Sequence, residues 1–121
     1  RILIVDDNVD AADSLSMLLQ ASGHVTAVAY SGADAIDRAR AFRPDVVLLD
    51  IGLPGMSGYE VARALRADEC CDRAVFVALT GWGTDDDRKR SMDAGFDVHL
   101  TKPVDTSRLD ALLAEIGANR S

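Results

Sequence analysis

The chain has 121 residues, a length that suits one domain with a buried core. Its composition, 48% hydrophobic and 27% charged, is that of a soluble globular protein and excludes a disordered one. No apolar run approaches the roughly 20 residues of a membrane span, and no secretory leader is visible, so we expect a cytoplasmic location and no membrane contact. The net charge of −7 argues against nucleic acid as a direct ligand. Because the chain opens on Arg1 inside a strand-like run, we expect a fragment of a longer protein.

The first predicted elements are a buried strand over residues 2–5 and a helix that follows it. Asp6 and Asp7 stand where this strand ends, and Asn8 or Asp10 can cap the helix, which Gly23 terminates. Helical spacing predicts that the buried side of this helix contains Ala11, Leu15, Leu18 and Ser22, and that Ala12 and Leu19 widen it.

The central part of the chain predicts two further strands and two further helices. Residues 24–30 form a strand, and a helix that begins after Ser31 ends before Pro44. Residues 46–49 are apolar without alternation, which is typical of a strand buried on both faces, and Asp50 follows directly. Ser57 and Glu60 form a capping box for the third helix.

The last part predicts two strands, over 74–80 and 96–100, and two helices. The helix over 84–94 has only Met92 and Ala94 as clear apolar members, so we expect packing to hold it weakly and this helix to be the most mobile. The final helix is capped by Asp105 and has a regular apolar stripe at Leu109, Leu112, Leu113 and Ile116.

Five strands that alternate with five helices predict an α/β fold with a doubly wound parallel sheet. The connections are short and no linker or repeat interrupts the chain. We therefore expect residues 1–121 to form a single domain.

Polar side chains follow four of the predicted strands. Asp6 and Asp7 follow the first, Asp50 the third, Thr80 the fourth and Lys102 the fifth. The carboxyl ends of parallel strands meet at one edge, where ligands of such folds bind. Three clustered carboxylates repel one another unless a hard cation such as Mg²⁺ binds them. Together with a hydroxyl donor and a lysine, they are the parts needed for phosphoryl transfer onto a carboxylate.

A metal at this edge could also use a backbone oxygen, because the carbonyl of Gly52 can turn back toward it. Each member of the set has a plainer interpretation. The acidic pair could cap a helix, Thr80 could simply end a strand, and Lys102 with Pro103 could form a turn. Their joint occurrence at four strand ends favours a functional site.

Over nearly its full length the chain resembles the receiver domain of two-component response regulators. The resemblance is carried by four loops: the Asp6-Asp7 pair, residues 48–58 around Asp50, residues 78–81 and the Lys102-Pro103 pair. It implies a flavodoxin-like sheet of order 2-1-3-4-5 and phosphorylation of Asp50 by a histidine kinase or phosphotransfer domain. It also implies Mg²⁺ held by Asp7, Asp50 and the Gly52 carbonyl, with Asp6 acting through water, and a cis bond before Pro103.

Two residues near the expected site depart from the family pattern or add to it. In the family, an aromatic residue three positions before the lysine rotates inward together with the threonine that Thr80 matches. This chain has His99 there, which either acts in the switch with a pH-dependent charge or is an uninvolved surface imidazole. Trp82 either tunes the site or is a bystander, and its fluorescence is expected to respond to Mg²⁺.

Other functions have weaker support. An aspartyl-nucleophile phosphatase would need a second acid two positions after Asp50, where Gly52 stands. A flavin or nucleotide module would need a phosphate-binding loop after the first strand, where residues 6–10 are acidic. An unphosphorylated receiver would not need the complete acceptor set. Residues 95–103 look more like receivers of hybrid histidine kinases than those joined to DNA-binding domains, so further domains of a parent chain are expected partners.

Overall fold

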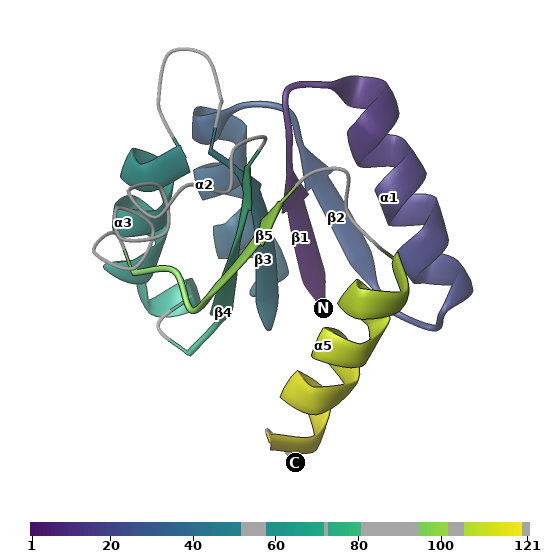
Figure 1. Cartoon of the computed structure of the whole chain (residues 1–121). Coiled ribbons are helices and arrows are strands. Elements are labelled where there is room, and N and C mark those ends of the chain that lie inside the picture. The colour runs from purple at the N-terminus through teal and green to yellow at the C-terminus, as the bar shows by residue number, and fades with distance from the viewer. Residues whose placement is uncertain (52–57, 72, 81–94, 102–105, 120–121) are drawn as a thin grey trace.

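The protein is described from a computed structural model, which covers residues 1–51, 58–71, 73–80, 95–101 and 106–119. Five parallel strands form one sheet in the order β2-β1-β3-β4-β5 (Figure 1). They are β1 (Ile2–Val5), β2 (Thr26–Ala29), β3 (Val46–Asp50), β4 (Val75–Thr80) and β5 (Val98–Thr101). The expected parallel sheet and its strand order are confirmed.

Within the described residues there are four α-helices and one short 3₁₀ helix. They are α1 (Val9–Ala21), α2 (Gly32–Phe42), α3 (Gly58–Arg66), α5 (Thr106–Asn119) and η1 (Glu69–Cys71). The fifth expected helix, over 84–94, lies outside the described residues, so its presence and mobility stay predictions. None of the helices described here is long and apolar enough to cross a membrane.

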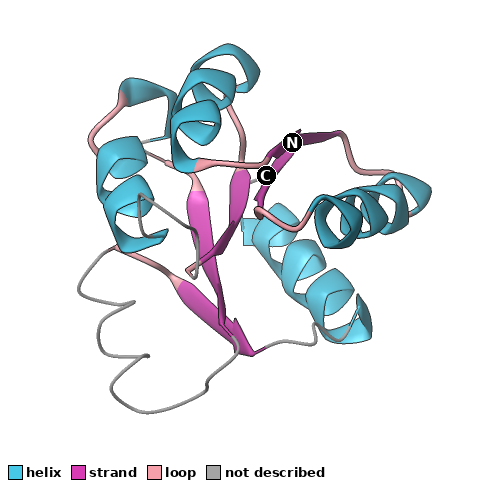
Figure 2. Ribbon diagram, turned by 90° about the horizontal axis from the view of Figure 1, so that it is seen from above, coloured by secondary structure: helices cyan, strands magenta, loops and turns pink. Residues whose placement is uncertain are grey.

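The helices cover both faces of the sheet (Figure 2). Alternate residues of β1 belong to two separate apolar clusters: Leu3 and Val5 pack with α2 and α3, whereas Ile2 and Ile4 pack with α1 and α5. This separation follows from the alternation of side chains along a strand. The doubly wound arrangement inferred from the sequence is therefore present.

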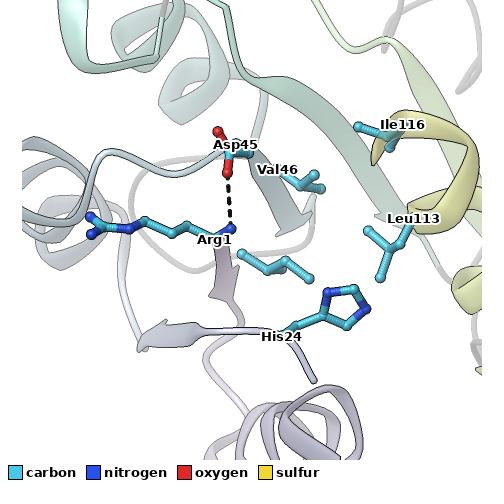
Figure 3. Close-up of a pocket in the computed structure, with 7 residues that line it drawn as sticks. Arg1, His24, Asp45, Val46, Leu113 and Ile116 are labelled. Atoms are coloured by element: carbon cyan, nitrogen blue, oxygen red, sulfur yellow. Dashed lines mark hydrogen bonds and ion pairs between the residues drawn. The ribbon is translucent and has the colours of Figure 1, made fainter. Parts of the chain in front are cut away.

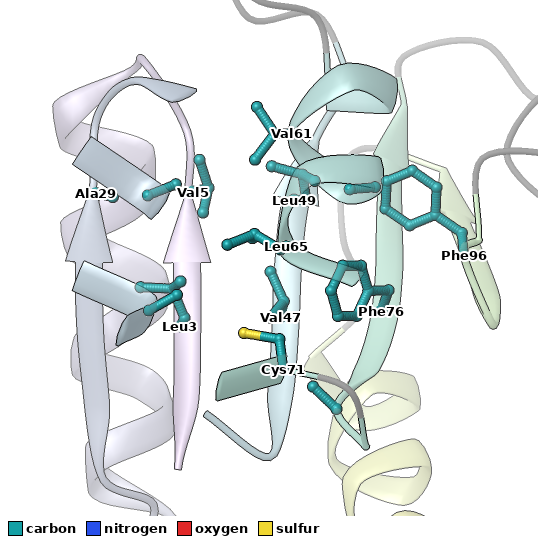
Figure 4. Close-up of a cluster of buried hydrophobic side chains, with 14 of the residues drawn as sticks. Leu3, Val5, Ala29, Val47, Leu49, Val61, Leu65, Cys71, Phe76 and Phe96 are labelled. Carbon is teal, nitrogen blue, oxygen red and sulfur yellow. The ribbon is translucent and has the colours of Figure 1, made fainter. Parts of the chain in front are cut away.

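The larger cluster lies between the sheet and α3 (Figure 4). Val47 and Leu49 of β3 meet Val61 and Leu65 of α3, and all four side chains are fully buried. All five residues of β3 are buried, which confirms the interpretation of its unalternated apolar run. Because the core holds β3 and α3 together, the end of β3 has little freedom to move.

The expected buried side of α1 is partly wrong. The structure buries Ala12, Ser16 and Leu19, whereas Leu18 is 52% exposed and Ala11 and Ser22 are also exposed. The error comes from Ser16, whose hydroxyl lies 2.7 Å from that of Thr26 on β2 and so can be buried at low cost.

Two predicted helix caps are confirmed. The Asn8 side chain accepts a hydrogen bond from the Ala11 amide (3.1 Å), and the Ser31 hydroxyl accepts one from the Asp34 amide (3.2 Å). The caps expected at Ser57 and Asp105 lie outside the described residues.

Arg66, the last residue of α3, ties together the segments that precede β4 and β5. Its guanidinium donates to the carbonyl oxygens of Ala74 and Gly95, both at 2.7 Å, and to Asp97 Oδ2 at 2.8 Å. It also lies 4.2 Å from the centroid of the Phe76 ring. These contacts fix the entry of β5 into the sheet.

Candidate functional site

Three carboxylates meet at the carboxyl edge of the sheet. Asp6 directly follows β1 and Asp50 ends β3, and the parallel register pairs Val5 with Leu49, the residues just before them. One oxygen from each of Asp6, Asp7 and Asp50 lies within 4.8 Å of the others. The structure thus brings together the three predicted acids, which come from two separate strand ends.

The surroundings of the three acids differ. Asp6 is only 5% exposed, and its Oδ1 accepts a hydrogen bond from the Asn8 amide at 3.0 Å, which turns the chain from β1 into α1. Asp50 is 8% exposed, whereas Asp7 is open to solvent. The cluster therefore has two buried members and one exposed side through which a small group can enter.

The backbone beyond Asp50 is held from two sides. The Ile51 amide donates to the Leu79 carbonyl of β4 at 3.1 Å, and the Ile51 carbonyl accepts from the Gly58 amide, the first residue of α3, at 3.2 Å. These two hydrogen bonds hold the backbone next to Asp50 in one position. A nucleophile or metal ligand requires such a fixed position.

The donor set fits Mg²⁺. All three groups offer carboxylate oxygens, the ligands that this hard cation prefers, and Mg²⁺ typically uses one or two carboxylates together with water and phosphate oxygens. A cation there would also offset the repulsion among three nearby negative charges. Asp6, Asp7 and Asp50 are therefore the residues that could hold it.

Thr80 and His99 are in contact, which bears on the undecided role of His99. Thr80, at the end of β4, is 6% exposed, and its Oγ1 lies 2.6 Å from Nε2 of His99 on β5. The register pairs His99 with Ala78, which puts it diagonally opposite Thr80 on the same face of the sheet. The imidazole is thus in contact with a residue of the predicted site.

Three other residues of the sequence analysis, Gly52, Trp82 and Lys102, lie outside the described residues. Their roles remain predictions, as does the cis bond before Pro103.

A separate pocket lies at the opposite edge of the sheet (Figure 3). It is lined by residues at the starts of β1 and β3 and by α5, among them Val46 and Leu113. The amino group of Arg1 donates to Asp45 Oδ2 there at 3.0 Å. Since Asp50 ends the strand that Val46 begins, this pocket is no part of the acidic site.

Comparison with known proteins decides the family. The family model of the response regulator receiver domain matches residues 2–114. The chain is a receiver domain. The expected resemblance is confirmed over nearly the whole sequence, and it makes the chain a domain of two-component signalling.

Curated relatives of this receiver domain are response regulators. It is 40% identical over 111 residues to the DNA-binding response regulator MtrA of Mycolicibacterium paratuberculosis, a match that covers 92% of this chain and 48% of MtrA. It is 35% identical over 107 residues to the polar-differentiation response regulator DivK of Brucella ovis, covering 88% of this chain and 87% of DivK. The chain thus spans about half the length of the MtrA relatives that it matches.

Solved structures with the same fold include receivers from two kinds of protein. The chemotaxis protein CheY4 of Vibrio cholerae superposes with a TM-score of 0.90 at 26% identity, covering 95% of this chain and 96% of that one. The receiver domain of the sensor histidine kinase PA1611 from Pseudomonas aeruginosa superposes with a TM-score of 0.86 at 32% identity, covering 96% of each chain. The PA1611 receiver was solved with a magnesium ion coordinated in its active site cleft.

Proposed function

We propose that this receiver domain accepts a phosphoryl group onto Asp50 from the phosphohistidine of a histidine kinase or phosphotransfer domain, in a reaction that depends on Mg²⁺. The observation that carries the proposal is the convergence of Asp6, Asp7 and Asp50 at the carboxyl edge of the sheet. Magnesium in the cleft of the PA1611 receiver supports the choice of metal. Residues 1–121 act as one phosphoacceptor domain in this proposal.

In the proposed reaction, one carboxylate oxygen of Asp50 attacks the phosphorus of the phosphohistidine. The new O–P bond makes an aspartyl phosphate, the N–P bond breaks, and the departing imidazole nitrogen keeps the electron pair and takes up a proton. Bound Mg²⁺ supplies charge neutralisation for the phosphoryl oxygens. Asp7, Asp50 and the Gly52 carbonyl hold the metal in this scheme, and Asp6 acts through water.

Two more side chains complete the proposed site. The Thr80 hydroxyl donates to a phosphoryl oxygen, and the Lys102 ammonium pairs with the negative charge that accumulates there. The buried position of Thr80, at the same sheet edge as Asp50, supports the first assignment. The assignment of Lys102 depends on the family resemblance.

The phosphoryl group adds about two negative charges, and a signal requires a second conformation that this charge favours. We assign the switch to Thr80 and His99, because Thr80 cannot move toward Asp50 without changing its 2.6 Å contact with His99. The surface over the 84–94 region, β5 and α5 is the proposed output face.

The proposed partner is a kinase or phosphotransfer protein in the cytoplasm, and the domain itself is a phosphoacceptor, not an enzyme for a separate substrate. Contact with nucleic acid or membrane is not part of the proposal, in keeping with the charge of −7. The likeness to the PA1611 receiver, at 32% identity, supports a parent chain of the hybrid histidine kinase type, whereas the 40% identity to MtrA supports one with a DNA-binding domain.

The proposal is tested by mixing the protein with Mg²⁺ and acetyl phosphate and measuring the intact mass. We expect a gain of one phosphoryl group, no gain when the metal is chelated, and no gain in Asp50→Asn, which keeps the size of the side chain but removes the attacking carboxylate. Uptake by Asp50→Asn equal to the wild type would show another acceptor and overturn the assignment.

A further inference from the structure

Gly58 lies against the backbone that carries Asp50. A Cβ atom built at Gly58 would lie 2.6 Å from Ile51 Cα and 2.8 Å from the Asp50 carbonyl oxygen, closer than real Cβ atoms come to other heavy atoms. Both neighbours are backbone atoms, so no side-chain rotation could relieve the overlap. Any residue other than glycine would push apart the end of β3 and the start of α3.

Position 58 requires glycine because a side chain has no room there, and not because of its backbone conformation. Gly23 and Gly95 have φ values of +96° and +99°, a conformation that L residues rarely adopt, but no Cβ contact closer than 3.7 Å is found at either of them. Gly58 instead begins a helix, where alanine would ordinarily be the better residue. The close approach to Asp50 and Ile51 is what sets it apart.

The other residues of α3 hold the helix against the sheet, so it cannot easily move away from β3. Val61, Ala62 and Leu65 are fully buried against the sheet, and Arg66 is bonded to Ala74 and Gly95. A close-packed interior of this kind transmits strain rather than absorbing it. A methyl group at position 58 would therefore displace the Asp50–Ile51 backbone as well as α3.

We propose that Gly58 is a positioning residue for the phosphoacceptor: its missing side chain lets α3 seat against β3 and sets where the Asp50 carboxylate lies relative to Asp6 and Asp7. The inference rests on the proposed function and deepens it. Mg²⁺ demands near-ideal octahedral geometry, so a small shift of one carboxylate weakens its binding. The same shift moves the attacking oxygen of Asp50 out of line with the phosphorus atom.

The test compares Gly58→Ala with the matched control Gly23→Ala. The control also adds one methyl group to a glycine, and it strains a positive-φ position with nothing within 4 Å of the new atom. Three quantities are measured for each: the Mg²⁺ dissociation constant by calorimetry, phosphoryl uptake from acetyl phosphate, and the urea midpoint without metal.

For Gly58→Ala we expect Mg²⁺ binding to weaken about tenfold and phosphoryl uptake to slow by about a hundredfold. For Gly23→Ala we expect a lower urea midpoint with wild-type Mg²⁺ affinity and uptake. Gly58→Ser should behave like Gly58→Ala, because the Cβ atom itself makes the overlap. A merely structural role would lower the urea midpoint in both glycine variants and leave Mg²⁺ affinity unchanged.

If Gly58→Ala is unfolded in buffer, the measurements are repeated in trimethylamine N-oxide, which favours the compact state. A variant that stays unfolded there, or that binds Mg²⁺ as tightly as the wild type, would overturn the positioning role. Failure of the wild type to take up phosphoryl groups would count against the proposed function instead, and the Mg²⁺ comparison would still test Gly58.

Discussion

Thr80 Oγ1 and His99 Nε2 lie 2.6 Å apart, across the pair of strands that ends beside Asp50. In one neutral tautomer Nε2 accepts a hydrogen bond from the Thr80 hydroxyl. In the other neutral tautomer, and in the protonated ring, Nε2 donates to Thr80 Oγ1, so the hydroxyl hydrogen can bond to another group. Protonation of His99 therefore frees the Thr80 hydroxyl hydrogen for a phosphoryl oxygen where the neutral imidazole had accepted it. Tyrosine or phenylalanine, the usual residues here, have no such charge change near neutral pH.

We predict that phosphoryl uptake depends on pH through His99. As the pH is lowered from alkaline to acid and His99 gains a proton, the rate should rise relative to His99→Gln by several-fold, because the Thr80 hydroxyl is released. The check is the ratio of wild-type to variant uptake from acetyl phosphate across this range, since a ratio removes pH effects that both proteins share.

Other charges near His99 have to be held constant in that comparison. Arg108 and Glu115 of α5 line a pocket to which β5 also contributes, but α5 packs on the face of Val98 and Leu100, opposite the His99–Thr80 contact, and both charges are retained in the variant. His99→Tyr is the second control, because its hydroxyl can bond to Thr80 without gaining a positive charge. A flat ratio for His99→Gln would show that the imidazole charge does not reach the reaction.

Asp7 gives the second prediction, which concerns metal-dependent stability. A ligand that binds only the folded state adds about 2.7 kcal/mol at a hundred times its dissociation constant. Asp7→Asn should lose most of this Mg²⁺-dependent gain while its unfolding free energy without metal changes little, because Asp7 is exposed. Urea unfolding with and without Mg²⁺ measures both quantities.

The matched control is Asp10→Asn, which removes an exposed carboxylate in the first turn of α1 outside the cluster. It should lose a few tenths of a kcal/mol of helix-end stabilisation and keep the full response to Mg²⁺. Equal Mg²⁺ responses in the two variants would mean that Asp7 does not bind the ion.

The sheet and the acid cluster could be predicted because each depends on a strong local pattern. The unalternated run of β3 indicates a sheet covered on both faces, and the polar residues after four strands indicate the edge where Asp6, Asp7 and Asp50 meet. The buried side of α1 was partly missed because Ser16 is polar, and only the position of Thr26 on β2 explains its burial.

The remaining details depend on distances that a sequence does not contain. The Thr80–His99 contact follows from the register of β5 against β4, and the role of Gly58 follows from how closely α3 approaches β3. The 3₁₀ helix η1 was not predicted, because it is only three residues long and has no apolar periodicity.

Arg66 gives the third prediction. Arg66→Met keeps most of the apolar stem over Phe76 but leaves the carbonyl oxygens of Ala74 and Gly95 without these donors. Because those contacts are partly buried, the free energy of unfolding should fall by about 2–3 kcal/mol, as measured by urea denaturation. Arg40→Met is the control: its pair with Asp68 is 61% exposed on the arginine side, so a loss below about 1 kcal/mol is expected.

The fourth prediction concerns alkaline pH and Tyr30. The Tyr30 hydroxyl donates to Asp13 Oδ1 at 2.6 Å, and this hydrogen bond raises the pKa of Tyr30 above its ordinary value of 10.0. Above about pH 10 the unfolded chain releases this proton before the folded protein does, so the unfolded state binds fewer protons and stability falls as pH rises. The contribution is complete below the unfolded pKa and is lost as pH passes the folded pKa.

Tyr30→Phe should therefore show a shallower loss of stability than the wild type between about pH 9 and about pH 11, measured from urea midpoints. Asp13→Asn should be intermediate, because the amide oxygen can still accept the hydrogen bond while the negative charge that also opposes tyrosinate is gone. A hydrogen bond that favours neutral tyrosine makes stability depend on the titration of Tyr30. If stability falls equally with pH in all three proteins, the Tyr30–Asp13 hydrogen bond does not persist in solution.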